Sequence, residues 1–134
     1  MRRRPRAAGS NEDGRWGSVD VCVLSNDLIF FSGVEGVAGA MGHKARQVGS
    51  LTEVGSPDLL IADFVSAAVE VTALAEAFEP LRTAIFTPHE HVEVFSAARA
   101  NGIAHVYRRG ALAMELPRIL AEYATGADGA VPLV

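Results

Sequence analysis

The feature of this sequence that most constrains its fold is the apolar run Leu59-Leu60-Ile61-Ala62, which ends in Asp63. The run contains no polar alternation, so it does not match a strand that exposes one face to water. Such a run suits a strand buried on both faces, as in a parallel sheet that is covered by helices. The run therefore predicts an α/β domain with Asp63 at the carboxyl end of a central strand.

Strand and helix signals alternate along the rest of the chain. Short apolar segments predict further strands at Val19 to Leu24, Lys44 to Val48, Thr83 to Phe86 and Ala104 to Tyr107. Apolar residues at helical spacing predict helices at Leu28 to Met41, Ser66 to Phe78, Thr87 to about Ala100, and a last one around Leu116 to Tyr123 with Pro117 in or near its first turn. Short links between these elements call for a parallel sheet with helices on both faces. In such sheets the site lies beyond the carboxyl ends of the strands, where the strand order reverses.

Capping residues mark several helix starts. Ser25-Asn26-Asp27 supplies turn and cap side chains before the first helix, and Ser50-Leu51-Thr52-Glu53 is a capping box that opens at most a turn or two. Thr87-Pro88-His89-Glu90 is a second capping box, with proline at the first helical position. The first helix also carries a glycine at every third position from Gly33 to Gly39, a stripe that predicts close packing against a neighbour.

Length and charge limit the number of domains and the kinds of partner. A chain of 134 residues with 49% hydrophobic residues fits one domain. We expect residues 19–125 to form it, with loosely ordered tails at 1–18 and 126–134. The net charge of -4 argues against a dedicated nucleic-acid surface. The basic start, Met1 to Arg6, is interpreted as part of the tail, although an arm that touches phosphates or a membrane is the alternative.

Targeting and redox signals point to a cytoplasmic protein. No apolar segment follows the N-terminal arginines, so we expect no secretory signal, and no run approaches the ~20 apolar residues of a membrane helix. The single cysteine, Cys22, lies in an apolar run and is predicted to be a small core residue. A reducing, cytoplasmic setting fits these features.

The residues at the strand ends resemble those of the receiver domains of bacterial response regulators, over roughly Asp20 to Tyr123. The segment from Pro57 to Asp63 looks like the family's third strand, which ends in the phospho-accepting aspartate. Thr87, after Ile85-Phe86, takes the position of the conserved hydroxyl. Arg109, counted from Gly102, takes the position of the invariant lysine. The resemblance implies a flavodoxin-like or CheY-like fold, with a five-stranded parallel sheet in the order 2-1-3-4-5 between two helical layers. It also implies a role in two-component signalling or a phosphorelay.

The site departs from the family pattern at several positions. Ser25 and Asn26 stand where the family keeps two adjacent acids, and a slip of one residue would place Asn26 and Asp27 there instead. The lysine is replaced by Arg109, and Gly110 follows where the family usually has a proline. The aromatic switch position is Val106, with Tyr107 one step away on the other face. These changes indicate an atypical receiver, or pseudo-receiver.

Each candidate site residue also has an ordinary structural interpretation. Asp63 could simply bind the loop after its strand, Thr87 could act only as a helix cap, and Ser25 and Asn26 could be polar turn residues. Arg109 could pair with Asp63 in the absence of phosphate. The pair His89 and His91 does not complete a set of ligands with zinc spacing, so no metal site is predicted there.

Magnesium is the cofactor that the resemblance implies, because the ion neutralises an incoming phosphoryl group. Mg²⁺ prefers one or two carboxylates plus waters. With Asp63 as the one acid of the site, the local negative charge would be about one unit, and Mg²⁺ would bind weakly. A guanidinium is also not equivalent to an ammonium. We therefore expect no tightly bound cofactor and no enzymatic activity.

Three functions are compatible with the sequence. The preferred one is a receiver-like signalling domain that acts through contacts with a protein partner or a second copy, without Mg²⁺-dependent phosphorylation. A working receiver with Asp63 as phospho-acceptor is the first alternative, and a flavodoxin-like domain for a small ligand is the second. By resemblance, the partner face lies on the fourth helix, fifth strand and fifth helix of the family's fold, and here it comprises His91, Phe95, Arg99, Tyr107 and Tyr123.

Overall fold

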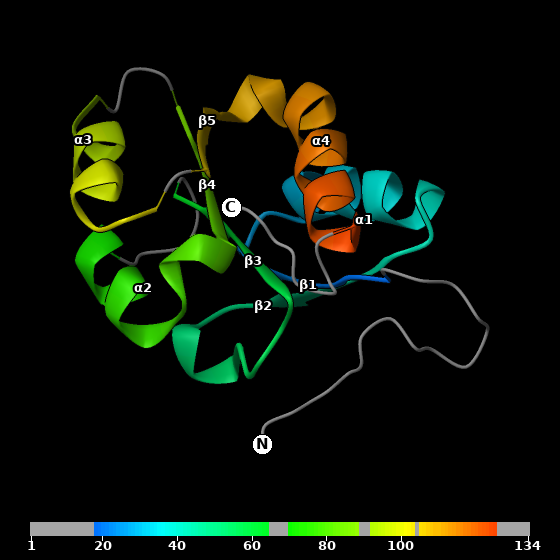
Figure 1. Cartoon of the computed structure of the whole chain (residues 1–134), viewed down its shortest axis with the longest axis horizontal. Helices are drawn as coiled ribbons and strands as arrows, with labels where there is room; N and C mark the ends of the chain where they lie inside the picture. The colour runs from blue at the N-terminus through cyan, green and yellow to red at the C-terminus, as the bar shows by residue number, and fades with distance from the viewer. Residues whose placement is uncertain (1–17, 65–69, 89–91, 104, 126–134) are drawn as a thin grey trace.

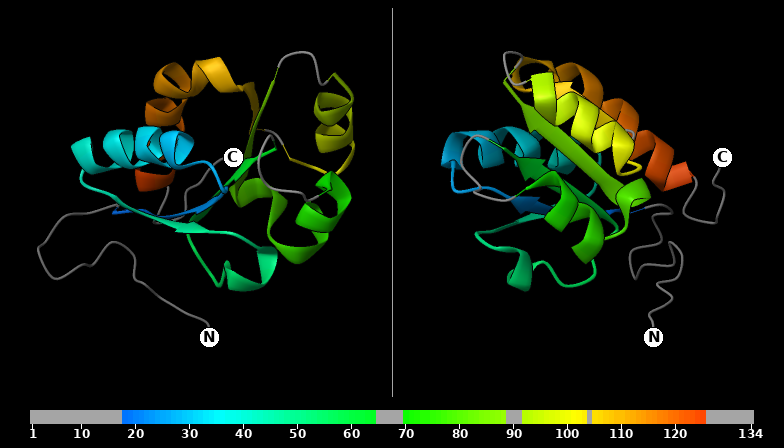
Figure 2. Two further views of the ribbon diagram at one scale, coloured as in Figure 1. Left: turned by 180° about the vertical axis from the view of Figure 1, so that it is seen from behind. Right: turned by 90° about the vertical axis from the view of Figure 1, so that its left-hand side faces the viewer.

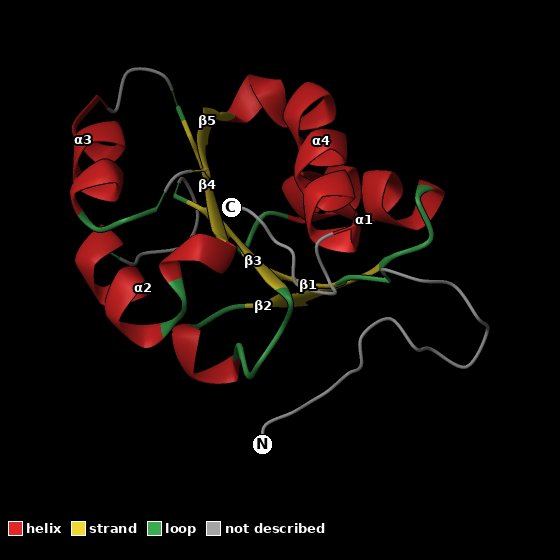
Figure 3. Ribbon diagram, in the orientation of Figure 1, coloured by secondary structure: helices red, strands yellow, loops and turns green. Residues whose placement is uncertain are grey.

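The computed structural model describes residues 18–64, 70–88, 92–103 and 105–125. Five strands form one parallel sheet in the order β2-β1-β3-β4-β5. The strands are β1 (Asp20–Leu24), β2 (Lys44–Val48), β3 (Leu59–Asp63), β4 (Thr83–Thr87) and β5 (His105–Arg108). Figures 1 and 3 show the twisted sheet running through the middle of the molecule. The predicted fold class and strand order are therefore confirmed.

Helices cover the two faces of the sheet in pairs. Helices α1 (Leu28–Ala40) and α4 (Leu112–Thr125) lie on one side, and α2 (Val71–Ala77) and α3 (Val92–Ala100) lie on the other (Figures 1 and 2). Each layer closes its own core, one with Val34 and Leu120 and the other with Leu74 and Ala98. The sheet lies between these two cores, which gives the three-layer architecture.

The apolar run of β3 is buried on both faces of the sheet. Leu59 and Ile61 point into the core of α1 and α4, while Leu60 and Ala62 point into the core of α2 and α3. All four are fully buried. Because full burial of a leucine or isoleucine side chain contributes about 1.5–3 kcal/mol, this register is strongly specified. It places Asp63 at the carboxyl end of the central strand.

Several predicted boundaries and caps shift. Helix α1 ends at Ala40, and Gly42, at a φ of 85°, turns the chain toward β2. Helix α2 begins at Val71, and residues 65–69, in the first part of its predicted span, lie outside the described residues.

In the capping box that starts at Ser50, Glu53 accepts the backbone N–H of Gly49 at 2.9 Å, and the Ser50 side chain makes no capping hydrogen bond. The box opens only one 3₁₀ turn, Leu51–Glu53. The second capping box lies partly in residues 89–91, which also lie outside the described residues.

The last helix begins earlier than the apolar residues from Leu116 onward predicted. A 3₁₀ turn at Arg109–Ala111 leads directly into α4, so helical backbone begins well before Pro117. Pro117 consequently lies inside the helix, in its second turn, which is near the first turn as predicted. A second short 3₁₀ turn, Pro80–Arg82, precedes β4 and was not predicted.

The glycine stripe of α1 makes only one close contact. A Cβ added at Gly33 would stand 3.2 Å from Leu112 Cδ2 of α4, whereas Cβ atoms at Gly36 and Gly39 would meet nothing within 4 Å. Close packing is therefore confirmed at Gly33 and wrong at Gly36 and Gly39. The stripe turns away from α4 because three residues advance less than one helical turn.

Cys22 is buried in the core, and burial raises the pKa of its thiol to about 11. The thiol is accordingly protonated, as expected for a small core residue. In the part of the chain that the structure describes, no helix is long and apolar enough to span a bilayer. The predicted tails, 1–18 and 126–134, fall almost entirely outside the described residues.

Candidate functional site

The candidate site forms at the carboxyl ends of β1, β3 and β4. Asp63 is the last residue of β3, Thr87 is the last residue of β4, and Ser25 directly follows β1. Because the strands are parallel, these three residues meet at one edge of the sheet. All three are buried, and Asp63 has 0% exposure. A buried carboxylate at a strand end needs partners, since an isolated one would be strongly disfavoured.

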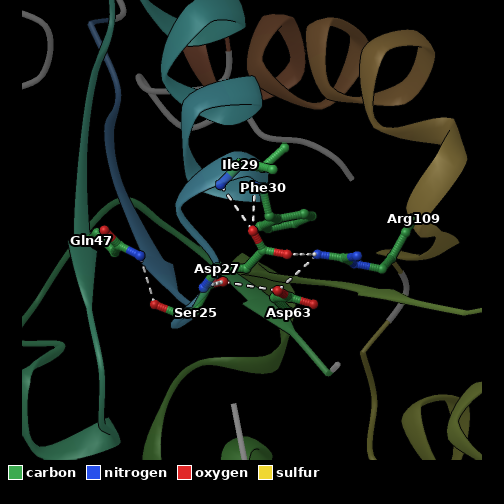
Figure 4. Close-up of polar contacts among 7 residues, drawn as sticks. All are labelled: Ser25, Asp27, Ile29, Phe30, Gln47, Asp63 and Arg109. Carbon is green, nitrogen blue, oxygen red and sulfur yellow. Dashed lines mark hydrogen bonds and ion pairs between the residues drawn. The ribbon is translucent and has the colours of Figure 1, made fainter. Parts of the chain in front are cut away.

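Two side chains supply partners for Asp63 (Figure 4). Ser25 Oγ donates a hydrogen bond to Asp63 Oδ2 at 2.8 Å. Arg109 Nη2 lies 3.1 Å from the same oxygen. The pairing of Arg109 with Asp63 is one of the interpretations open from the sequence, and the structure confirms it. The contact joins residues from β3 and from the 3₁₀ turn that follows β5.

Asp27 is the second carboxylate of the site, and it has two roles. Its Oδ1 accepts the backbone N–H groups of Ile29 at 2.9 Å and Phe30 at 3.2 Å, which caps α1. Its Oδ2 lies 3.0 Å from Arg109 Nη2. The N–H of Phe30, followed by the hydrogen bond from Arg109, lowers the pKa of Asp27 below its ordinary value of 3.8. Asp27 is therefore ionised and held in place from two sides.

Arg109 bridges the two carboxylates and also packs on an aromatic ring. Its guanidinium carbon lies 4.9 Å from the centroid of the Phe30 ring, a cation–π distance. Phe30 is buried in the first turn of α1, so the helix that Asp27 caps also carries the ring under Arg109. Two carboxylates and one guanidinium give a formal local charge of -2 + 1 = -1. The sequence left two registers open, one with Asp63 as the one acid and one that adds Asp27, and in the structure Asp27 does reach Arg109.

Further hydrogen bonds hold the turn between β1 and α1. The backbone N–H of Asp27 donates to Ser25 Oγ at 3.0 Å, and Gln47 Nε2 of β2 donates to the carbonyl of Ser25 at 2.9 Å. Ser25 thus links Asp63 to the helix cap. Gln47 and Phe30 were not predicted as site residues. A polar glutamine within a predicted strand could have indicated Gln47. The helical spacing of Phe30 indicated only that it lies in the core.

The sequence left two pairs of residues open for the positions of the family's two acids, Ser25 with Asn26 or Asn26 with Asp27. Each pair leaves out a residue that contacts the site. Ser25 and Asp27 contact the site through Asp63 and Arg109, while the Asn26 between them is exposed. Asn26 instead lies toward β2, because a Cβ at Gly49 would stand 3.2 Å from its Oδ1. The predicted site positions Ser25, Asp27, Asp63 and Arg109 are brought together by direct contacts.

Thr87 occupies the predicted strand end with its hydroxyl buried. Its Oγ1 has no hydrogen-bond partner among the described residues, and the same holds for Arg109 Nε. A buried hydroxyl without a partner costs stability and is uncommon in native proteins. Since 89–91 and 65–69 are not described, the cap predicted for Thr87 remains a prediction.

The carboxylates do not fit a magnesium site in this arrangement. Mg²⁺ takes oxygen ligands at ~2.0–2.1 Å and needs room for several waters. Here Arg109 Nη2 lies 3.0 Å from Asp27 Oδ2 and 3.1 Å from Asp63 Oδ2 and occupies the space between them. Within the described ranges, no group of three or more His, Cys, Asp or Glu residues could hold a metal ion. The predicted His89 and His91 lie outside the described residues.

The predicted partner face is partly described. Phe95 is half-buried and Arg99 exposed on α3, while Tyr107 on β5 and Tyr123 on α4 are half-buried, and His91 lies outside the described residues. Tyr107 packs on Phe86 with ring centroids 5.6 Å apart, and its hydroxyl lies 3.1 Å from His105 Nδ1. Val106 packs in the opposite core, as predicted. β5 is an edge strand of the sheet.

Solved structures with the same architecture share little sequence with this chain. A response regulator receiver domain protein from Clostridium thermocellum matches with a TM-score of 0.67 and 16% identity over 81% of this chain and 96% of its own. A CheY-like receiver domain protein from Methanospirillum hungatei matches with a TM-score of 0.62 and 12% identity over 81% of this chain and 98% of its own. No family model and no curated protein sequence matches the chain.

NtrX from Brucella abortus also matches, with a TM-score of 0.61 and 15% identity over 83% of this chain. The chain spans only 28% of the length of that structure. Similarity at these identities defines the fold. The protein described here therefore has the CheY-like receiver-domain fold, and Asp63 ends the central strand of its sheet.

Proposed function

We propose that this chain is an atypical receiver-like signalling domain that acts through protein contacts and does not depend on Mg²⁺-dependent phosphorylation. One observation carries the proposal: Arg109 bridges Asp27 and Asp63 at 3.0 and 3.1 Å, where a phosphate-accepting site would need a cation. The bridge offsets the charge that would attract Mg²⁺ and covers the oxygen that would attack a phosphoryl donor. The chain is proposed to be a binding module, not an enzyme.

Phosphorylation is tested by incubating the protein with acetyl phosphate and Mg²⁺ and recording intact-mass spectra. We expect no phosphoryl adduct across a range of Mg²⁺ concentrations, while a competent receiver domain in the same reaction mixture acquires one. An adduct on the wild-type chain that is absent from Asp63→Asn would contradict the proposal and establish the alternative.

The alternative of a working phospho-receiver has one specific observation in its favour. Asp63 is fully buried at the end of β3, and the hydroxyl of Thr87, at the end of β4, has no partner among the described residues. An added phosphoryl group would offer acceptors to that hydroxyl. The same mass spectra distinguish the two functions, because only the alternative predicts an adduct.

The partner face is proposed to lie on α3, β5 and α4, with a protein partner or a second copy as its ligand. Arg99→Glu reverses an exposed charge in the middle of this face, and Phe95→Glu adds a charge to its apolar part. Glu35→Lys on the exposed side of α1 is a matched control. If self-association observed by light scattering is lost in Glu35→Lys and kept in the face variants, α1 is the contact surface and this part of the proposal fails.

A further inference from the structure

We propose that Arg109 replaces the divalent cation of this fold: its guanidinium neutralises Asp27 and Asp63 from within the chain, and a cation binds there only when Arg109 is removed. The inference rests on the proposed function and gives it a physical cause. It concerns one side chain and two carboxylates, whose contacts are drawn in Figure 4.

The geometry places a single positively charged atom between the two acids. Arg109 Nη2 is 3.0 Å from Asp27 Oδ2 and 3.1 Å from Asp63 Oδ2. A hard cation would take the same two oxygens at ~2.0–2.1 Å for Mg²⁺ or ~2.3–2.6 Å for Ca²⁺. The nitrogen and an ion therefore compete for the same position. A dication would also have to approach a guanidinium of like charge.

The two carboxylates are held in place without the help of Arg109. Asp27 accepts two backbone N–H groups of α1 through its other oxygen, and Asp63 accepts the hydroxyl of Ser25. Removing Arg109 would therefore leave two converging carboxylates with a formal charge of -2. Carboxylate pairs of this kind attract hard divalent cations, which gain two oxygen ligands and retain their remaining waters.

The surroundings of Arg109 select arginine over lysine. The planar guanidinium lies on the Phe30 ring at 4.9 Å while it contacts both carboxylates. An ammonium is a compact, strongly hydrated charge without a planar face to lie on the ring. The replacement of the family's lysine by Arg109 thus fits a permanent neutralising role. The Arg109 side chain is 29% exposed and Asp63 is fully buried, so water screens the contact only in part.

The test compares cation binding by the wild-type chain and by Arg109→Met. Mn²⁺ is titrated into ¹⁵N-labelled protein, and paramagnetic broadening of amide signals reports where the ion binds. In Arg109→Met we expect broadening centred on Ser25, Asp27 and Asp63, and a rise in Tm of about 4 °C or more with saturating Mg²⁺ or Ca²⁺. The wild-type chain should show neither effect. Arg118→Met, which removes an exposed arginine of α4, should behave as wild type.

A double variant, Asp27→Asn with Arg109→Met, tests the ligand set. Asparagine keeps the helix cap but removes one charge, so the cation response should be lost. If Arg109→Met does not fold, Arg109→Gln is the second variant, with the same expected response. Equal broadening of the wild-type site, broadening confined to other residues, or a folded Arg109 variant without a response would each overturn the inference.

The outcome is separable from that of the proposed function. A phosphoryl adduct on the wild-type chain would contradict the proposed function, whatever the variants bind. An insensitive, folded Arg109→Met together with an unphosphorylated wild type would contradict only the role of Arg109 as a built-in cation.

Discussion

Arg109→Met should destabilise the fold, because it removes the positively charged partner of the buried carboxylate of Asp63. Removing one partner of a buried ion pair costs about 3–5 kcal/mol. Asp63 is fully buried, but Arg109 retains 29% exposure, so part of that cost is relieved by water. We therefore expect a loss of about 2–3 kcal/mol in the free energy of unfolding. In a domain of this size the loss corresponds to a fall in Tm of about 10–15 °C.

Urea unfolding followed by circular dichroism, at neutral pH and with EDTA, measures this loss. Arg118→Met is the control: the Arg118 side chain is 72% exposed, so the change should be within about 0.5 kcal/mol. Adding Asp63→Asn to Arg109→Met should restore part of the stability, because the uncompensated charge is then absent. If Arg109→Met unfolds at the same urea concentration as wild type, the bridge contributes nothing to stability and the reasoning about it is wrong.

Other predictions concern α1 and α4. The pKa of Asp27 is lowered mainly by the N–H of Phe30, so the stabilisation it provides is present above pH 3.8 and lost as the pH falls through the lower folded value. Asp27→Asn should flatten acid denaturation curves, and an unchanged slope would contradict this. Gly36→Ala should raise stability by about 0.5–1 kcal/mol, and Gly33→Ala should raise it less, because its Cβ would contact α4 at 3.2 Å; equal gains in urea melts would count against that contact. Burial raises the pKa of Tyr123 from 10.0 to about 12, so wild-type stability should fall as the pH rises between those values. Tyr123→Phe should reduce that fall in alkaline unfolding curves, and it should cost about 1 kcal/mol at neutral pH because the hydroxyl donates a hydrogen bond to the carbonyl of Leu81.

The fold was predictable because its signals are local. The apolar run that ends in Asp63 specifies a strand buried on both faces, and helical spacing specifies the layers that cover it. These patterns depend on the residues of one segment and on the period of its backbone. Boundaries were less predictable, as Pro117 shows: the 3₁₀ turn at Arg109–Ala111 starts the helical path earlier than the apolar spacing does.

The site was only partly predictable because its contacts join distant segments. Asp63 was assigned to its strand end, and its pairing with Arg109 was one open interpretation. The role of Asp27 was not resolved, since the choice between Asn26 and Asp27 depends on which way each side chain points after α1 has docked. Phe30 was assigned to the core by its spacing, but its ring also supports Arg109. Helical periodicity does not distinguish these two uses.

The amino-acid sequence by itself therefore determined the α/β architecture and the place of Asp63 at the carboxyl end of its central strand. Only the tertiary structure decided that Asp63 and Asp27 share one guanidinium, because Arg109 lies 46 and 82 residues away from them along the chain. The spacing of apolar residues along a segment indicates which face of a helix or strand is buried. The partner of a charged side chain is set by how whole elements pack, and that packing converts three separate charged residues into one bridged site.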